Sequence, residues 1–210
     1  MNKVLLTALM IVFAFGLPAC GPLLFGNDAS SEEPCGFVQN VYGQRISWKG
    51  SVPVILKIHQ SVPREMINGI YEAADVWNQA LGKRVFEITE TNFSGPVLPR
   101  KDTQNVIYWS YAWDGTNAEE QARTNIYWVG DEMKEADIAI NAETNTFYYG
   151  KSTSNKDIDL ISVMVHEFGH VLGLAHHDSA KSVMATYLNP LSERRELAKY
   201  DKDSIRCEYK

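Results

Sequence analysis

Apolar residues recur at steps of three and four in two stretches of the chain, and this spacing predicts two amphipathic helices. The first stretch runs from Pro63 to Gly82, where proline suits the first turn and glycine the position just past the end. The second covers residues 157–174, and its apolar side is formed by Ile161, Val165, Phe168 and Leu172. Residues 191–209 are expected to form one or two short closing helices.

Before and between these helices, short runs rich in β-branched and aromatic residues predict strands. They are bounded by glycine, asparagine and aspartate, which favour turns, and they lie at residues 52–59, 84–89, 105–111, 124–130, 136–141 and 146–150. One helix, a run of strands, a central helix and a final helix predict an α+β domain.

The first 19 residues have the layout of a signal peptide. Lys3 precedes an apolar run over residues 4–17, which is too short to span a bilayer as a permanent helix. The following Leu-Pro-Ala-Cys resembles a bacterial lipobox, so we expect cleavage before Cys20 and lipid attachment to it; an ordinary signal peptide with a chance cysteine is the alternative. Residues 20–35 then form a flexible tether and 36–210 one domain. The expected location is extracytoplasmic, in a bacterial cell envelope, lipid-anchored at the outer membrane or cell surface.

The net charge and the cysteine count restrict the binding partners and the cellular compartment that can be expected. A formal net charge of −6 disfavours nucleic acid and anionic lipid head groups, which attract clustered lysine and arginine. Membrane contact is therefore expected through the lipid anchor only, and the domain is expected to be a monomer. With Cys20 lipidated, Cys35 and Cys207 remain, and an even number of cysteines outside the cytosol predicts a disulfide. Two unpaired thiols are the alternative.

The stretch HEFGHVLGLAHH, residues 166–177, holds four of the chain's five histidines. On a helix, His166 and His170 share one face, and Glu167 is one step around from the first. Gly173 favours the left-handed conformation that ends a helix, after which the chain can bring His176 back to the same point. Three neutral imidazoles suit tetrahedral Zn²⁺ and leave a fourth position for water, as in catalytic sites. The alternative is a buried helix that is rich in histidine by chance.

This stretch fits H-E-x-x-H-x-x-G-x-x-H, the zinc signature of the metzincin metallopeptidases, and the flanking sequence is similar to the matrixin type. DLISVMVHEFGHVLGL resembles that group's active-site helix, ADIAIN its characteristic strand and AADVWNQA its first helix. The resemblance implies a zincin-like catalytic domain with a mixed twisted sheet of about five strands. An amphipathic helix, an active-site helix and a C-terminal helix would accompany the sheet.

The resemblance also implies roles for single residues. His166, His170 and His176 would bind one catalytic Zn²⁺, Glu167 would activate the zinc-bound water as general base, and Met184 would form the turn beneath the metal. The protein would then be a zinc endopeptidase acting on protein or peptide substrates. A second, structural zinc is not expected, because the one histidine outside this stretch lies far upstream. The sequence assigns no Ca²⁺ site.

Substrates of this family lie extended along an edge strand. We expect residues 146–150, including Tyr148, to form that edge, and Tyr187 with the following loop to line the substrate pocket. EPCG at residues 33–36 resembles the segment whose cysteine caps the zinc in matrixin precursors, which makes Cys35 a candidate inhibitory thiolate. The segment lacks the family's arginine, and in the matrixin fold the start of the domain lies near its last helix. Both points favour the disulfide with Cys207.

Two other functions share the same metal site. One is a non-catalytic envelope lipoprotein that binds zinc, and the other is a metal hydrolase that acts on cell-wall crosslinks. A purely structural zinc site needs no base beside an open coordination position, so the presence of Glu167 favours an enzyme.

Overall fold

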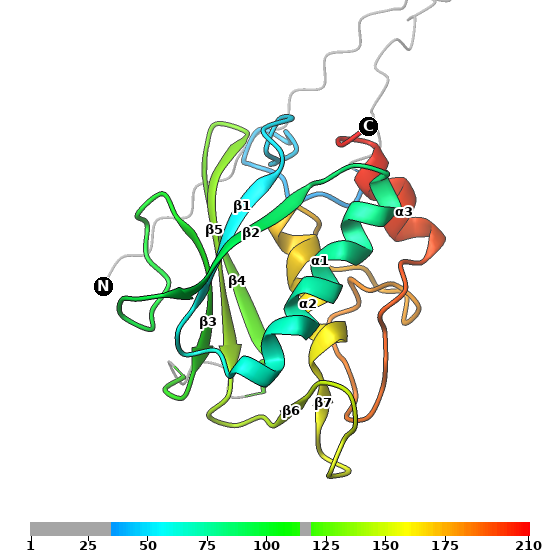
Figure 1. The fold of residues 1–210 in the computed structure, drawn as a ribbon. Coiled ribbons are helices and arrows are strands. Elements are labelled where there is room, and N and C mark those ends of the chain that lie inside the picture. The colour runs from blue at the N-terminus through cyan, green and yellow to red at the C-terminus, as the bar shows by residue number, and fades with distance from the viewer. Residues whose placement is uncertain (1–34, 114–118) are drawn as a thin grey trace, which may run out of the picture. The chain divides into compact units, whose positions relative to one another are not determined.

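The computed structural model describes residues 35–113 and 119–210 (Figure 1). The expected signal peptide, Cys20 and nearly all of the expected tether therefore lie outside the described residues. Within the described ranges, no helix is both long and apolar enough to cross a membrane.

A mixed sheet of five strands forms the frame of the domain, which confirms the predicted α+β class. The strands are β1 (Val54–His59), β2 (Phe86–Phe93), β3 (Asn105–Ser110), β4 (Ala122–Val129) and β5 (Glu132–Asn141). Their spatial order is β2-β1-β3-β5-β4. Parallel pairing joins β2, β1, β3 and β5, whereas β4 runs antiparallel to β5 and lies at the edge of the sheet.

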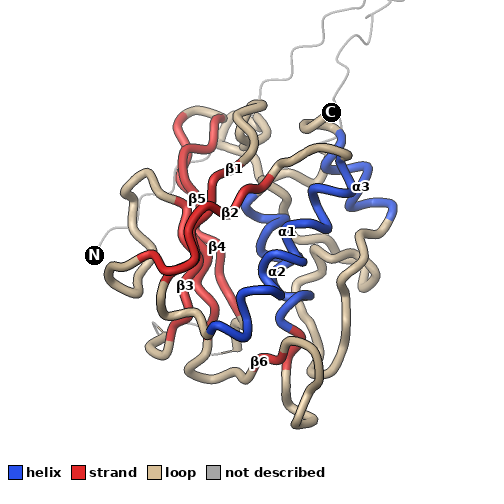
Figure 2. The backbone as a smooth tube through the Cα atoms, viewed as in Figure 1, coloured by secondary structure: helices blue, strands red, loops and turns tan. Residues whose placement is uncertain are grey.

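Two long helices lie on the same side of this sheet (Figure 2). A 3-10 turn, η1 (Arg64–Met66), leads into α1 (Ile67–Leu81), and α2 (Leu160–Val171) follows the strands. The buried residues of α1 lie on one side of the helix and are Gly69, Ile70, Ala73, Ala74 and Trp77. One of them, Trp77, also donates a 3.0 Å hydrogen bond from Nε1 to the carbonyl oxygen of Val165 in α2.

The closing segment is less helical than expected. Residues 191–198 form loops and turns, and helix α3 covers only Lys199–Arg206. The loop is held to the start of α2 by a two-pronged ion pair, because Arg195 donates from Nε to Asp159 Oδ2 at 2.8 Å and from Nη2 to Oδ1 at 2.6 Å. Asp159 is also the N-cap of α2 and accepts from the backbone N–H of Ser162.

Aromatic packing fixes the rotation of α2 about its axis. The rings of Phe86 in β2 and Phe168 in α2 lie 4.8 Å apart, and both side chains are buried. Burial of each such side chain contributes about 2–3 kcal/mol. His166 and His170 are each two residues from Phe168, about 200° around the helix, so they face away from this core.

The expectation that residues 146–150 form the edge strand is wrong. Phe147–Tyr148 form β6, which pairs in parallel with β7 (Ile158–Asp159) in a separate two-stranded sheet. Tyr148 is accordingly buried. The edge strand beside α2 is β4, which is the last strand in the sheet order and pairs with β5 across the turn at Gly130.

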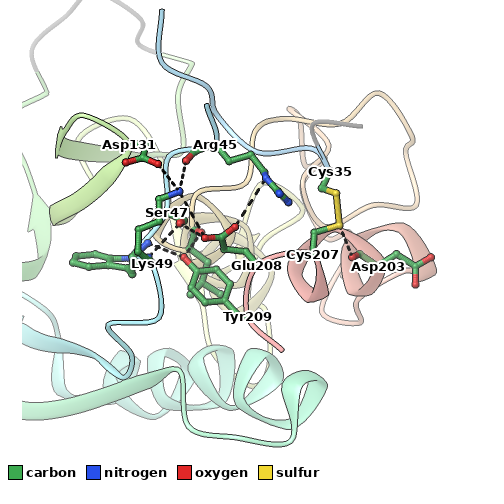
Figure 3. A network of polar contacts seen from close by, with 11 residues as sticks. Cys35, Arg45, Ser47, Lys49, Asp131, Asp203, Cys207, Glu208 and Tyr209 are labelled. Carbon is green, nitrogen blue, oxygen red and sulfur yellow. Dashed lines mark hydrogen bonds and ion pairs between the residues drawn. A yellow bond between two sulfur atoms is a disulfide. The ribbon is translucent and has the colours of Figure 1, made fainter. Parts of the chain in front are cut away.

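The two ends of the domain are tied together beside α3 (Figure 3). Cys35 and Cys207 form a disulfide with their Cα atoms 6.3 Å apart, as the cysteine count predicts. Next to it, Ser47 Oγ donates to Glu208 Oε1 at 2.6 Å, and Lys49 Nζ lies 3.8 Å from the same oxygen. A sulfur atom in a disulfide is not a free thiolate, so in this oxidised form Cys35 does not act as an inhibitory metal ligand.

Candidate active site

Three histidine side chains converge at the C-terminal half of α2. His170 Nε2 lies 3.0 Å from His166 Nε2 and 3.2 Å from His176 Nε2, and the ligand atoms of the three residues all lie within 4.8 Å of one another. Tetrahedral Zn²⁺ with bonds of 2.0–2.1 Å separates its nitrogen ligands by about 3.3–3.4 Å. The spacing therefore fits one zinc ion held by all three rings.

The far nitrogen of two rings is fixed by backbone oxygens. His166 Nδ1 lies 2.8 Å from the carbonyl oxygen of Val183, and His170 Nδ1 lies 2.8 Å from that of Leu174. A carbonyl only accepts, so each Nδ1 carries the proton and each Nε2 keeps a lone pair for a metal. Burial lowers the pKa of both His166 and His170 to about 4, which keeps these rings neutral at pH 7.

Gly173, called the joint below, lets the chain turn after α2 so that the third histidine reaches the first two. Gly173 follows the end of α2 with φ +100°, a conformation that other residues rarely adopt. The segment after it is held by the start of the domain, since Val38 N–H donates to the Gly173 carbonyl at 2.8 Å and Ala175 N–H donates to the Gly36 carbonyl at 2.7 Å. These bonds fix the chain just before His176.

Met184, which the sequence predicts to form a turn beneath the site, lies against α2, the helix that carries His166 and His170. Its side chain is buried and contacts α2 at Gly169, where a Cβ atom would overlap the methionine sulfur. The turn is also joined to the histidine segment, because His177 N–H donates to the Met184 carbonyl at 2.9 Å. Buried Asp201 in α3 accepts from the Val183 N–H at 3.1 Å and supports the turn from the other side.

Glu167 is buried beside the histidines and is held from the edge strand. Only 4% of the residue is exposed, and Thr124 of β4 donates a 2.5 Å hydrogen bond from Oγ1 to Glu167 Oε2. Burial raises the pKa of the carboxyl group above its ordinary value, and the Thr124 hydrogen bond opposes this rise. Sequence reasoning did not single out Thr124; alternation along residues 124–130, had that run been recognised as the edge strand, would have placed it on one face with Ile126.

An open cleft of about 600 Å³ lies in front of these residues. Its walls come from β4, α2 and the loop after Met184, and they include Thr124, Ser162, His166, Glu167, Tyr187, Leu188 and Arg194. Tyr187 is 60% exposed and lines the cleft. Tyr148 does not line the cleft, because it lies in β6, in the separate two-stranded sheet. The prediction that Tyr148 lines the substrate pocket is therefore wrong.

Comparisons with known proteins point to one family. The sequence model of the matrixin family matches residues 55–210. The chain is 30% identical to stromelysin-3 from Mus musculus over 145 residues, which are 66% of this chain and 27% of that protein. It is 35% identical to matrix metalloproteinase-25 from Mus musculus over 78 residues, 37% of this chain and 12% of that protein.

A plant protein gives the same result over a shorter segment. Identity to metalloendoproteinase 1 from Glycine max is 41% over 59 residues, 28% of this chain and 19% of that protein. The matched segments thus span about a quarter or less of the length of these relatives.

Proposed function

The chain belongs to the matrixin family, and on this premise we propose that it is a zinc-dependent endopeptidase that cleaves protein or peptide substrates. One observation carries the proposal: three neutral imidazoles converge beside a buried carboxylate at the wall of an open cleft. This arrangement combines a metal-binding triad with a base and leaves space for a substrate.

His166, His170 and His176 would hold the ion through Nε2. Bound zinc supplies Lewis acidity, which lowers the pKa of water to about 7 and polarises a carbonyl group. The backbone carbonyls of Val183 and Leu174 keep two of the rings in the required tautomer and orientation. The binding of a second zinc or of calcium is not part of the proposal.

Glu167 would act as the general base. Its carboxylate would take a proton from the attacking water and return it to the amine that leaves. Burial moves the pKa of Glu167 upward, toward the range in which a carboxylate exchanges protons efficiently near neutral pH. Its place one residue from His166 brings it next to the metal ligands without making it one of them.

The substrate backbone would pair with the outer edge of β4. This strand lines the cleft at Ala122, Thr124 and Ile126 and uses its other edge to pair with β5. An extended peptide can add to such an edge through backbone hydrogen bonds. Tyr187 and the loop that follows it would contact the side chain after the cut bond.

The cleft separates this function from the alternatives. A non-catalytic zinc-binding lipoprotein would need neither Glu167 nor a cleft of about 600 Å³ in front of the triad. A hydrolase of cell-wall crosslinks would use the same metal chemistry, but an edge strand along the cleft favours extended peptides.

Measurements of zinc content and peptide cleavage on the full chain test the proposal. We expect one zinc per chain and cleavage of a broad peptide library, with cleavage lost in Glu167→Ala while zinc is retained. Loss of zinc in Glu167→Ala would contradict the assignment of a base outside the metal shell. A wild-type chain that binds zinc and cuts no peptide in the library would refute the enzyme.

We further propose that the protein is a bacterial envelope lipoprotein anchored through Cys20. The proposal is supported by the Leu-Pro-Ala-Cys segment at residues 17–20 after the apolar run. Cells that express the chain should incorporate a fatty-acid analogue into it, and Cys20→Ser should abolish incorporation. Label that persists in Cys20→Ser would contradict the anchor.

A further inference from the structure

We propose that Thr124 is a positioning residue for Glu167, which orients the base from the strand that carries the substrate. This inference rests on the proposed peptidase function and adds a residue outside the histidine stretch. The observation that supports this inference is the 2.5 Å hydrogen bond from Thr124 Oγ1 to Glu167 Oε2. The two residues are 43 positions apart in the sequence and meet where β4 passes α2.

Strand geometry explains why this hydroxyl points at the base. Side chains alternate between the two faces of a strand, so Ala122, Thr124 and Ile126 share the face toward α2, whereas Arg123 and Asn125 lie on the other. The backbone of Thr124 is paired with Ile138 in the antiparallel ladder between β4 and β5. The hydroxyl is therefore carried by a rigid element and not by a loop.

The hydrogen bond gives the two carboxylate oxygens of Glu167 different surroundings, because only Oε2 accepts from the Thr124 hydroxyl. Rotation about the last torsion of a glutamate is broad, so an unrestrained carboxylate has no fixed orientation. Within the described ranges, Thr124 provides the one hydrogen bond seen to this carboxylate. Oε2 already accepts from the hydroxyl and Oε1 does not, so Oε1 is the oxygen that would be better placed to receive the proton from water.

The same strand would align both the base and the substrate. In the proposed function a peptide pairs with the edge of β4, and the hydroxyl that holds Glu167 belongs to the third residue of that strand. A shift of β4 would then move the substrate and the base together. Holding catalytic groups in the correct relative position is worth factors of about 10² for misplacements of about 1 Å.

Two substitutions in the full chain test the role. Thr124→Val keeps the shape of the side chain and removes the hydroxyl, so we expect kcat to fall by about tenfold or more while KM stays within about twofold. Thr124→Ser keeps the hydroxyl and should restore kcat to within about threefold of wild type. Both variants should retain one zinc per chain. Thr89→Val, an exposed position in β2, is the matched control and should leave kcat unchanged.

A second readout does not depend on cleavage. In the zinc-free protein, a double-mutant cycle of Thr124→Val and Glu167→Ala measures the coupling through the unfolding equilibrium constant. Because the hydroxyl donates to a buried carboxyl group, we expect the two effects to deviate from additivity by about tenfold. Additive effects would mean that the two side chains do not interact in solution.

The results of these experiments distinguish a failure of the positioning role from a failure of the proposed peptidase function. Suppose that the wild type cleaves peptides. A normal kcat in Thr124→Val, or a kcat in Thr124→Ser as low as that in Thr124→Val, then overturns the positioning role and leaves the proposed function standing. A wild type that cleaves nothing overturns the proposed function and with it any role of Thr124 in catalysis. The coupling measurement then still decides whether the contact exists.

Discussion

Replacing Gly173 by alanine should both destabilise the fold and loosen the third histidine of the proposed metal site. The residue has φ +100°, and the new Cβ atom would overlap the backbone carbonyl oxygen of Ile46. The strained backbone costs about 1–3 kcal/mol, and relief of the overlap by movement of packed backbone costs about 1–3 kcal/mol more. The expected loss of unfolding free energy is therefore about 2–6 kcal/mol. A backbone shift three residues before His176 should also weaken zinc binding by at least about tenfold, since ligand placement tolerates about 0.5 Å.

Gly82 provides the matched control for this prediction. It also has positive φ, +63°, but an added Cβ atom there would meet nothing within 4 Å. Gly82→Ala should therefore lose only about 1 kcal/mol and keep its zinc affinity. Urea unfolding of the zinc-free chain gives the stability of each variant, and competition with a chelating dye gives the zinc affinity. Equal stability losses in the two variants, with zinc affinity unchanged in both, would refute the steric argument for the joint.

Three further predictions concern the disulfide, pH and the metal. The disulfide closes a separation of 172 residues, so Cys35→Ser with Cys207→Ser should lower the unfolding free energy by about 2–5 kcal/mol in urea titrations; an unchanged midpoint would contradict this. Burial raises the pKa of Asp137 from 3.8 to about 7, so between these values the folded state holds the proton more tightly than the unfolded state, and stability falls as pH rises. Relative to Asp137→Asn, the zinc-free wild type should lose up to about 1.4 kcal/mol per pH unit in this window, and a constant difference would argue against the shift. Zinc at 100 times its dissociation constant should raise the unfolding free energy by about 2.7 kcal/mol, an effect that chelator removes and that His176→Ala greatly reduces.

The parts of the site that could be predicted from the sequence depend on local geometry. His166 and His170 are one helical turn apart, and Gly173 marks the end of the helix, so helix spacing alone brings them into register. The edge strand could not be identified in the same way, because residues 124–130 and 146–150 are both short and rich in β-branched or aromatic residues. Edge position follows from long-range pairing. The Gly130-Asp131 turn, which favours a hairpin between β4 and β5, is the local signal that distinguishes them.

Thr124 was not predicted for the same physical reason. A threonine in a strand is common, and its role depends on which helix passes its face. That helix is placed by the core, through Trp77 and Phe168, and not by the strand itself. Contacts between elements distant in the sequence therefore carry the functional information that the motif does not contain.

The end of α2 illustrates this dependence most directly. The last carbonyl groups of a helix have no partner within the helix. Here Val171 O accepts from Trp48 Nε1 at 2.7 Å, and Leu172 O accepts from the hydroxyl of Tyr209 at 2.8 Å. The next carbonyl, that of Gly173, accepts from the N–H of Val38. Segments from both ends of the domain thus complete the helix at the point where the chain turns toward the third histidine, and each bond contributes about 1 kcal/mol. The position of that histidine is consequently a property of the whole folded domain, and the histidine stretch on its own would not hold three rings at metal-binding distances.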